Sequence, residues 1–214
     1  MVGCVFRASL RYNTGMTHTD APIAIGVLAL QGDYEAHIGM LRRLEAEALP
    51  VRTPQELAHV HGLIIPGGES TTIGKLMELH GLAEPIRQRA QEGMPLFGTC
   101  AGMILLASQI EGSNQFRLGL VDITVARNAF GRQIESFEAD IAIPEIGSEP
   151  VRGVFIRAPY VTRTGPGVVE VARFRKKIVA VRSGRILATA FHPELTADTR
   201  VHAYFLDIVR QASL

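Results

Sequence analysis

The chain has 214 residues with 22 basic and 21 acidic side chains, which leaves a formal net charge of +1. A chain with such balanced charge has little positive electrostatic potential to attract a phosphate backbone, so nucleic acid is not an expected partner. Hydrophobic residues make up 47% of the chain, enough for a buried core. No apolar stretch approaches the roughly 20 residues that span a bilayer, so we expect no membrane association and a soluble protein.

Cysteine usage points to a reducing environment. The two cysteines, Cys4 and Cys100, are too few for a disulfide framework and have no metal-ligand spacing. We therefore expect a cytoplasmic protein without a bound metal or cofactor.

The first twenty residues differ from the rest of the chain. They carry Arg7 and Arg11 but no acidic residue before position 20, a composition faintly similar to a transit peptide. Because Met16 lies just before the first apolar run, a mis-assigned start codon or a disordered tail is the preferred interpretation over targeting. We expect an extension over residues 1–20 and one folded domain over residues 21–214.

Strand and helix patterns alternate in the first half of the chain. Residues 23–30 form a near-continuous apolar run, typical of a strand buried on both faces, and residues 33–47 have apolar side chains at helical spacing. Thr53, Pro54 and Glu56 form the start signal of a short helix. The pattern continues with a strand at 62–66, helices around 73–77 and 85–93, and a strand at 95–98. This order predicts a doubly wound, mostly parallel α/β sheet with flanking helices, whose ligands bind at the carboxyl ends of the strands.

The second half of the chain has a different pattern. β-Branched runs separated by glycine and proline occur at 121–125, 151–156, 168–171 and 178–181. Such runs predict additional antiparallel strands. An apolar face from Val201 to Val209 predicts a closing helix that begins near Asp198.

Cys100 lies where a strand meets a helix, between Gly98 and Gly102. This is the pattern of a nucleophile elbow with cysteine in place of serine. A lone cysteine at a strand end is commonly a small core residue, but the flanking glycines favour an exposed sulfur above the sheet. The dipole of the following helix would favour the thiolate, and the backbone N–H of Ala101 would be placed to bind an oxyanion.

Two further segments can serve the same chemistry. His192 and Glu194 follow a strand and fall on one side by the period-two rule, so that a carboxylate can orient the imidazole that a cysteine nucleophile needs. After the strand at 62–66, paired glycines precede Glu69 and Ser70, and the N–H of Gly68 could be a second oxyanion donor. Each segment alone is more often a simple turn; together they predict a Cys-His-Glu triad.

These motifs in combination resemble the class I glutamine amidotransferases. Within that group, the segments at 26–32, 126–132 and 155–159 are similar to the glutaminase subunits of pyridoxal 5′-phosphate synthases. The likeness runs in order from residue 23 to the C-terminus and leaves out only the first twenty residues. Several separate blocks that agree in order make a specific signal.

The resemblance implies a reaction. Cys100 would attack the side-chain amide of L-glutamine, release ammonia and form a γ-glutamyl thioester that water hydrolyses, with His192 as proton carrier. The substrate-binding positions that it implies are Gly68, Glu69, Ser70, Arg127, Ile156 and Arg157. Guanidinium and backbone groups suit an α-carboxylate and an α-amino group, although the two arginines alone could be solvated surface residues.

The resemblance also implies a partner. Ammonia would pass to a separate pyridoxal 5′-phosphate synthase subunit in a hetero-oligomer, and the free glutaminase would be poorly active until that subunit orders the oxyanion loop. Because Gln31 and Gly32 follow one strand and Gly67 and Gly68 follow another, we expect these residues to form part of the docking face.

Three other functions remain open from the sequence. Another ammonia-donating glutaminase, such as that of imidazole glycerol phosphate synthase, would share the triad, although the segments at 66–71 and 126–131 favour vitamin B6 synthesis. A cysteine peptidase or stress-response protein of similar fold would keep the elbow and need no glutamine pocket. A regulatory binding module with a vestigial site is disfavoured by the intact cysteine, histidine and glutamate.

Overall fold

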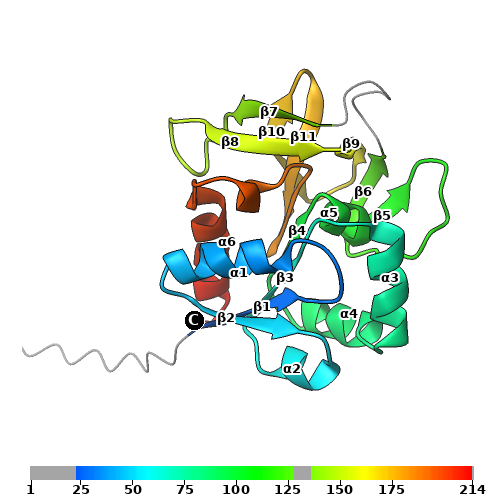
Figure 1. The fold of residues 1–214 in the computed structure, drawn as a ribbon. Helices are drawn as coiled ribbons and strands as arrows, with labels where there is room; N and C mark the ends of the chain where they lie inside the picture. The colour runs from blue at the N-terminus through cyan, green and yellow to red at the C-terminus, as the bar shows by residue number, and fades with distance from the viewer. Residues whose placement is uncertain (1–22, 128–135, 214) are drawn as a thin grey trace, which may run out of the picture.

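The protein is built on one large mixed sheet. The computed structural model describes residues 23–127 and 136–213, and the expected extension at 1–20 lies outside them. Ten strands form the sheet in the order β2-β1-β3-β4-β12-β11-β9-β6-β5, with β10 paired to β11 (Figure 1). Their bounds are β1 Ala24–Leu28, β2 Glu47–Val51, β3 Gly62–Ile65, β4 Leu96–Thr99, β5 Ala107–Ile110, β6 Val121–Ala126, β9 Tyr160–Thr164, β10 Val168–Phe174, β11 Lys177–Ser183 and β12 Ile186–Thr189. A separate antiparallel pair is formed by β7 Ser136–Ile141 and β8 Val151–Ile156.

Helices connect the strands of the first half and close the chain. They are α1 Tyr34–Arg43, α2 Pro54–Ala58, α3 Ser70–Leu79, α4 Ala83–Gln91, α5 Ala101–Leu106, α6 Arg200–Ala212 and the short 3₁₀ helix η1 Pro193–Leu195. In α2 the predicted capping box is present, with the Thr53 hydroxyl accepting from the Glu56 N–H. None of the helices in the described ranges is long and apolar enough to cross a membrane.

Successive side chains of β4 face helices on opposite sides of the sheet. Phe97 packs its ring near Phe205 of α6, whereas a side chain at Gly98 would point into α5. Thr99 again faces the first side, where its hydroxyl lies 3.2 Å from His37 Nε2 of α1. Helices α1 and α6 therefore cover one face of the sheet and α5 the other, which confirms the doubly wound α/β prediction.

The strands β2, β1, β3, β4 and β12 run parallel, and β11 pairs antiparallel with β12, β9 and β10, of which β10 and β11 were expected as antiparallel additions. The chain crosses from β1 outward to β2 and then back to β3 on the other side of β1. The order reverses at this point, where open α/β sheets bind their ligands beyond the carboxyl ends of the strands.

The expected helix over 33–47 is wrong at its C-terminal end. The helix stops at Arg43, and Glu45 takes a positive φ of 56°, the left-handed conformation that ends helices. Residues from Glu47 onward form β2, an edge strand, where Pro50 is tolerated because one side of the strand needs no N–H donor. The pattern of the sequence also does not predict β5, β7 or β9.

Two glycines allow the turn from β4 into α5 to form. A Cβ at Gly98 would lie 2.6 Å from the carbonyl carbon of Gly102, and a Cβ at Gly102 would overlap the carbonyl oxygen of Ile65 in β3. These distances are shorter than side-chain carbons tolerate, so any larger residue would push the helix off the sheet.

We expect Gly102→Ala to lower the free energy of unfolding by roughly 2–4 kcal/mol, because its methyl group would overlap backbone that cannot move alone. Gly39→Ala is the matched control, since a Cβ at this exposed position of α1 meets no atom of the described residues within 4 Å. That change should stabilise the protein by about 0.5–1 kcal/mol. Urea unfolding followed by circular dichroism measures both, and equal midpoints for the two variants would contradict the packing argument.

Candidate active site

Loops that follow four neighbouring parallel strands, β6 and β8 surround one cavity. Its volume is about 340 Å³, within the range of small-molecule sites. The lining residues are Gln31, Asp33, Gly68, Glu69, Ser70, Cys100, Ile104, Arg127, Ile156, Arg157 and His192. All six predicted substrate-binding positions are among them, together with Cys100 and His192. Glu194 and Ala101 lie behind the lining, both buried.

Cys100 occupies the strained position of the elbow. Its backbone has φ 48° and ψ −98°, and it forms the N-cap of α5. Only 7% of the residue is exposed, yet its sulfur faces the cavity, 3.8 Å from the carbonyl oxygen of Ile156. A non-glycine residue in this conformation costs of order 1–3 kcal/mol and persists only where its surroundings enforce it.

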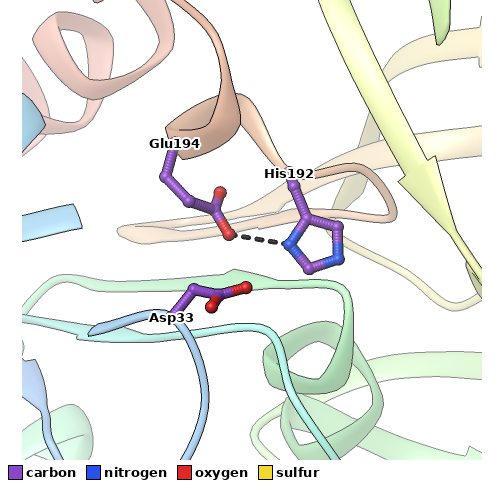
Figure 2. A group of neighbouring side chains, drawn as sticks. All are labelled: Asp33, His192 and Glu194. Carbon is purple, nitrogen blue, oxygen red and sulfur yellow. Dashed lines mark hydrogen bonds and ion pairs between the residues drawn. The ribbon is translucent and has the colours of Figure 1, made fainter. Parts of the chain in front are cut away.

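His192 and Glu194 are in contact as predicted, but not for the predicted reason. Nδ1 of His192 donates to Oε1 of Glu194 at 2.7 Å (Figure 2). The period-two interpretation is wrong, because β12 ends at Thr189 and Glu194 lies in η1, a 3₁₀ helix for which His192 is the N-cap. The tight turn of η1, rather than strand alternation, brings the carboxylate back to the ring.

The environment of His192 favours its cationic form. Burial alone would lower the pKa of His192, but hydrogen bonds to Cys100 and Glu194 and the charges of these groups raise it to about 10. For Glu194, burial acts to raise the pKa, and the opposing effects of His37 and His192 hold it well below its ordinary value. A cationic imidazole beside a sulfur stabilises the thiolate, which is the nucleophilic form.

The loop after β3 is held by the loop after β1. The side-chain oxygen of Gln31 accepts the N–H of Glu69 at 2.9 Å, and the N–H of Asp33 donates to the Gly67 carbonyl at 3.3 Å. Gly68 has φ 154°, where side chains are strained, and a Cβ there would lie 2.6 Å from the oxygen of Gln31. The conformation of this loop therefore depends on glycine and on Gln31 together.

Glu69 has a structural task that the sequence pattern did not indicate. Its carboxylate accepts the N–H groups of Thr71 and Thr72 and so caps α3. Burial acts to raise its pKa, but these hydrogen bonds lower it overall. Glu69 thus lines the cavity with a carboxylate already committed to the helix N-terminus.

Gln115 joins two of the predicted substrate-binding residues. Its amide nitrogen donates to the Ser70 hydroxyl at 2.9 Å, and its oxygen accepts from Arg127 at 2.7 Å. On the opposite wall, Arg157 follows β8 with a positive φ of 43°. Among the described residues, the site therefore holds two arginines, one fixed by a glutamine and one on strained backbone.

Several site residues carry no recognisable sequence signal. Gln115 lies in the loop between β5 and β6, and Ile104 lies one turn into α5; neither belongs to a motif. Asp33 was assigned only to the start of a helix. The tertiary fold, which local patterns do not encode, brings Ile104 and Asp33 to the cavity and Gln115 to its lining residues Ser70 and Arg127.

Asp33, His192 and Glu194 offer ligand atoms within 4.8 Å of one another, a spacing that could hold a metal ion (Figure 2). However, Nδ1 of His192 and Oε1 of Glu194 are already joined by their hydrogen bond. A metal would have to break this bond and compete with the proton that the raised pKa of His192 retains. The group is better suited to holding a proton than a cation.

Comparison with known proteins identifies a family for the chain. The model of the SNO glutamine amidotransferase family matches residues 27–211. The chain belongs to this family.

Curated relatives of this amidotransferase are close over nearly their whole length. A protein of Desulforudis audaxviator named pyridoxal 5′-phosphate synthase subunit PdxT is 59% identical over 87% of this chain and 99% of its own. One of Streptomyces avermitilis with the same name is 56% identical over 87% and 94%.

Solved structures agree with the fold. A crystal structure described as a glutamine amidotransferase is 51% identical, with a TM-score of 0.83 over 87% of this chain and 98% of that one. A structure described as PurLQS from Thermotoga maritima is only 17% identical but has a TM-score of 0.64 over 87% and 98%, which shows the fold alone.

The raised pKa of His192 predicts how the stability of this amidotransferase depends on pH. A group whose folded pKa exceeds its unfolded value of 6.5 stabilises the fold fully below that value, and the contribution is lost as pH rises toward 10. Relative to His192→Gln, the free energy of unfolding of the wild type should fall by up to about 1.4 kcal/mol per pH unit in this window. Urea titrations of both proteins at several pH values test this, and parallel curves would argue against a proton held on His192.

Proposed function

We propose that the chain is the glutaminase subunit of a pyridoxal 5′-phosphate synthase. It hydrolyses L-glutamine to L-glutamate and ammonia, and a separate synthase subunit uses the ammonia in vitamin B6 synthesis. The observation that carries the proposal is the row formed by Cys100, His192 and Glu194 at the wall of a cavity lined by both acidic and basic groups. The names of relatives more than 50% identical support the pathway.

In the first half of the reaction, the Cys100 sulfur attacks the amide carbon of glutamine. The oxygen becomes negative in the tetrahedral intermediate, and the N–H groups of Gly68 and Ala101 are the proposed donors to it. His192, held as a cation, gives its proton to the nitrogen as the carbon–nitrogen bond breaks. Ammonia leaves, and the γ-glutamyl group remains on the sulfur as a thioester.

In the second half, water replaces ammonia. His192, now neutral, takes a proton from the attacking water and keeps it as the carbon–sulfur bond breaks, so that the sulfur leaves as the thiolate beside a cationic imidazole. Glu194 keeps Nδ1 of the imidazole protonated throughout through the 2.7 Å hydrogen bond, so that only Nε2 exchanges protons. Glutamate and the starting enzyme are the products.

The charges of the cavity suit a zwitterionic amino acid. Arg127 and Arg157 offer guanidinium groups for an α-carboxylate, and Asp33 and Glu69 offer carboxylates near an α-amino group. Ile156 contributes its carbonyl oxygen, which already lies against the sulfur. We propose Gly68, Glu69, Ser70, Arg127, Ile156 and Arg157 as the substrate-binding residues.

The proposal also covers the domain bounds, the partner and the cellular location of the enzyme. Residues 21–214 would be the glutaminase domain, and the synthase subunit would dock beside Gln31, Gly32 and the loop at 67–68. A cytoplasmic location fits, because Cys100 must remain a reduced thiol. A glutaminase that serves imidazole glycerol phosphate synthase is the alternative, which the printed names of the close relatives disfavour.

We expect Cys100→Ala to abolish glutamate release from L-glutamine, since no other side chain of the elbow can form the thioester. The assay is run with and without a pyridoxal 5′-phosphate synthase subunit, and Cys4→Ala is the control that removes the other cysteine. Wild-type and Cys4→Ala turnover should rise when the synthase is added. If turnover is the same with and without the synthase subunit, the result would favour another ammonia acceptor.

We expect synthase-stimulated turnover to depend on the side-chain oxygen of Gln31. Gln31→Leu removes the acceptor for the Glu69 N–H, whereas Gln31→Glu keeps an acceptor of the same length. We expect synthase-stimulated turnover to fall about tenfold in the leucine variant, the effect of one lost hydrogen bond, and less in the glutamate variant. Complex formation is measured in parallel by sedimentation. Unchanged binding and turnover in Gln31→Leu would remove this residue from the docking face and from the loop.

A further inference from the structure

A pair of buried histidines lies behind the site, on the side away from the cavity. His37 of α1 and His202 of α6 are both fully buried, and Nδ1 of His37 lies 2.9 Å from Nε2 of His202. The ring of Phe97 meets both imidazoles edge-on. Neither histidine lines the cavity, and neither has a part in the mechanism above.

The pair reaches the acid–base residues through Glu194. Nε2 of His37 lies 3.4 Å from Oε1 of Glu194 and 3.2 Å from the hydroxyl of Thr99. The same Oε1 accepts from His192 at 2.7 Å, whereas Oε2 has no hydrogen-bond partner among the described residues. Two imidazoles on one oxygen are therefore what holds this buried carboxylate.

The position of the hydrogen on His37 follows from its neighbours. A lone pair on Nε2 would face the carboxylate, so Nε2 carries a hydrogen, which is shared between Glu194 and Thr99. His202 is neutral near pH 7, because burial lowers its pKa to about 3.

The neutral ring of His202 can fix this arrangement. Its Nδ1 has no partner among the described residues. An unpaired buried acceptor costs less than an unpaired N–H, so the hydrogen of His202 belongs on Nε2, which then donates to Nδ1 of His37. This leaves Nε2 of His37 as the donor to Glu194.

We propose that His37 is a positioning residue for the Cys100–His192 reaction, which holds the Glu194 carboxylate by a hydrogen bond from Nε2, and that His202 sets the tautomer of His37. The proposal rests on the proposed function, since it assigns a task within the same triad. Without His37, the carboxylate would keep a single partner and could rotate away from His192. The imidazole would then lose its orientation toward the sulfur.

Substitutions at position 37 separate a hydrogen-bonding role from packing. His37→Gln places an amide N–H near the position of Nε2, His37→Asn places it near Nδ1 and too far from Glu194, and His37→Leu keeps volume without any donor. With the synthase subunit present, kcat should fall about tenfold to a hundredfold in the leucine and asparagine variants, as for a lost bond to a charged partner. KM should change by less than about threefold, since His37 does not line the cavity. The glutamine variant should recover most of the loss.

A second readout does not depend on glutamine turnover. The rate at which iodoacetamide alkylates Cys100 near pH 7, followed by mass spectrometry of the Cys100 peptide, should fall in the same order as kcat. Circular dichroism melts identify a variant that fails to fold, and the comparison of His37→Gln with His37→Asn remains decisive if the leucine variant is lost. If these two polar variants match in kcat and in alkylation rate, His37 only fills space and the proposal is wrong.

The two assays also separate this proposal from the proposed function. A wild type that hydrolyses no glutamine but alkylates faster than His37→Asn would overturn the glutaminase assignment and keep the positioning role. Glutamine hydrolysis that is equal in all variants would overturn the positioning role of His37 and keep the glutaminase assignment.

Discussion

The strained backbone of Cys100 is the constraint on which the site depends. With φ 48°, this residue leaves the strand direction abruptly and lifts its sulfur above the end of β4. Three features keep the backbone of Cys100 in this conformation. Gly98 and Gly102 leave the room that it needs because they have no side chains, and the Cys100 N–H donates a 2.8 Å hydrogen bond to the Thr189 carbonyl of β12. Because that bond belongs to the neighbouring strand, the elbow is registered to the same strand that leads into His192. The distance between sulfur and imidazole is thus set by sheet geometry rather than by a flexible loop.

The parallel order of the sheet explains why so few residues suffice. β1, β3, β4 and β12 are neighbours, and each ends at the same edge. The residues that follow them provide the loop at 31–33, the paired glycines, Cys100 and His192. Each site residue follows its strand within a few positions. The strands themselves therefore hold these residues in place, and little conformational entropy is lost when the site forms. The antiparallel addition contributes a different wall, through Ile156 and Arg157 at the end of β8.

Sequence reasoning succeeded where a signal is local. The elbow, the capping box at Thr53 and the strand of apolar residues at 62–65 each contain their cause within a few residues. The His192–Glu194 pair was expected on the wrong grounds, since the geometry comes from η1. The sequence does not predict β2, because its alanine, glutamate and proline have low strand propensity and form a strand only by pairing with β1 at the edge of the sheet.

The residues that no pattern indicates make contacts across long sequence separations: Gln115 contacts Ser70 over 45 positions, and His202 contacts His37 over 165. Information of this kind exists only in the packed structure, in which a buried polar atom must find its partner.

Helix α1 connects the two sides of the site. The loop that leads into it carries Gln31, whose side-chain oxygen accepts the N–H of Glu69, and the start of the helix carries His37, which contacts Glu194. Both residues lie at the N-terminal end of α1, Gln31 just before the helix and His37 among its first four residues. One short segment of the chain therefore contacts both the loop after β3 and the carboxylate behind His192. In the proposed mechanism, this segment supports both the loop that contains the oxyanion donor Gly68 and the carboxylate that orients His192.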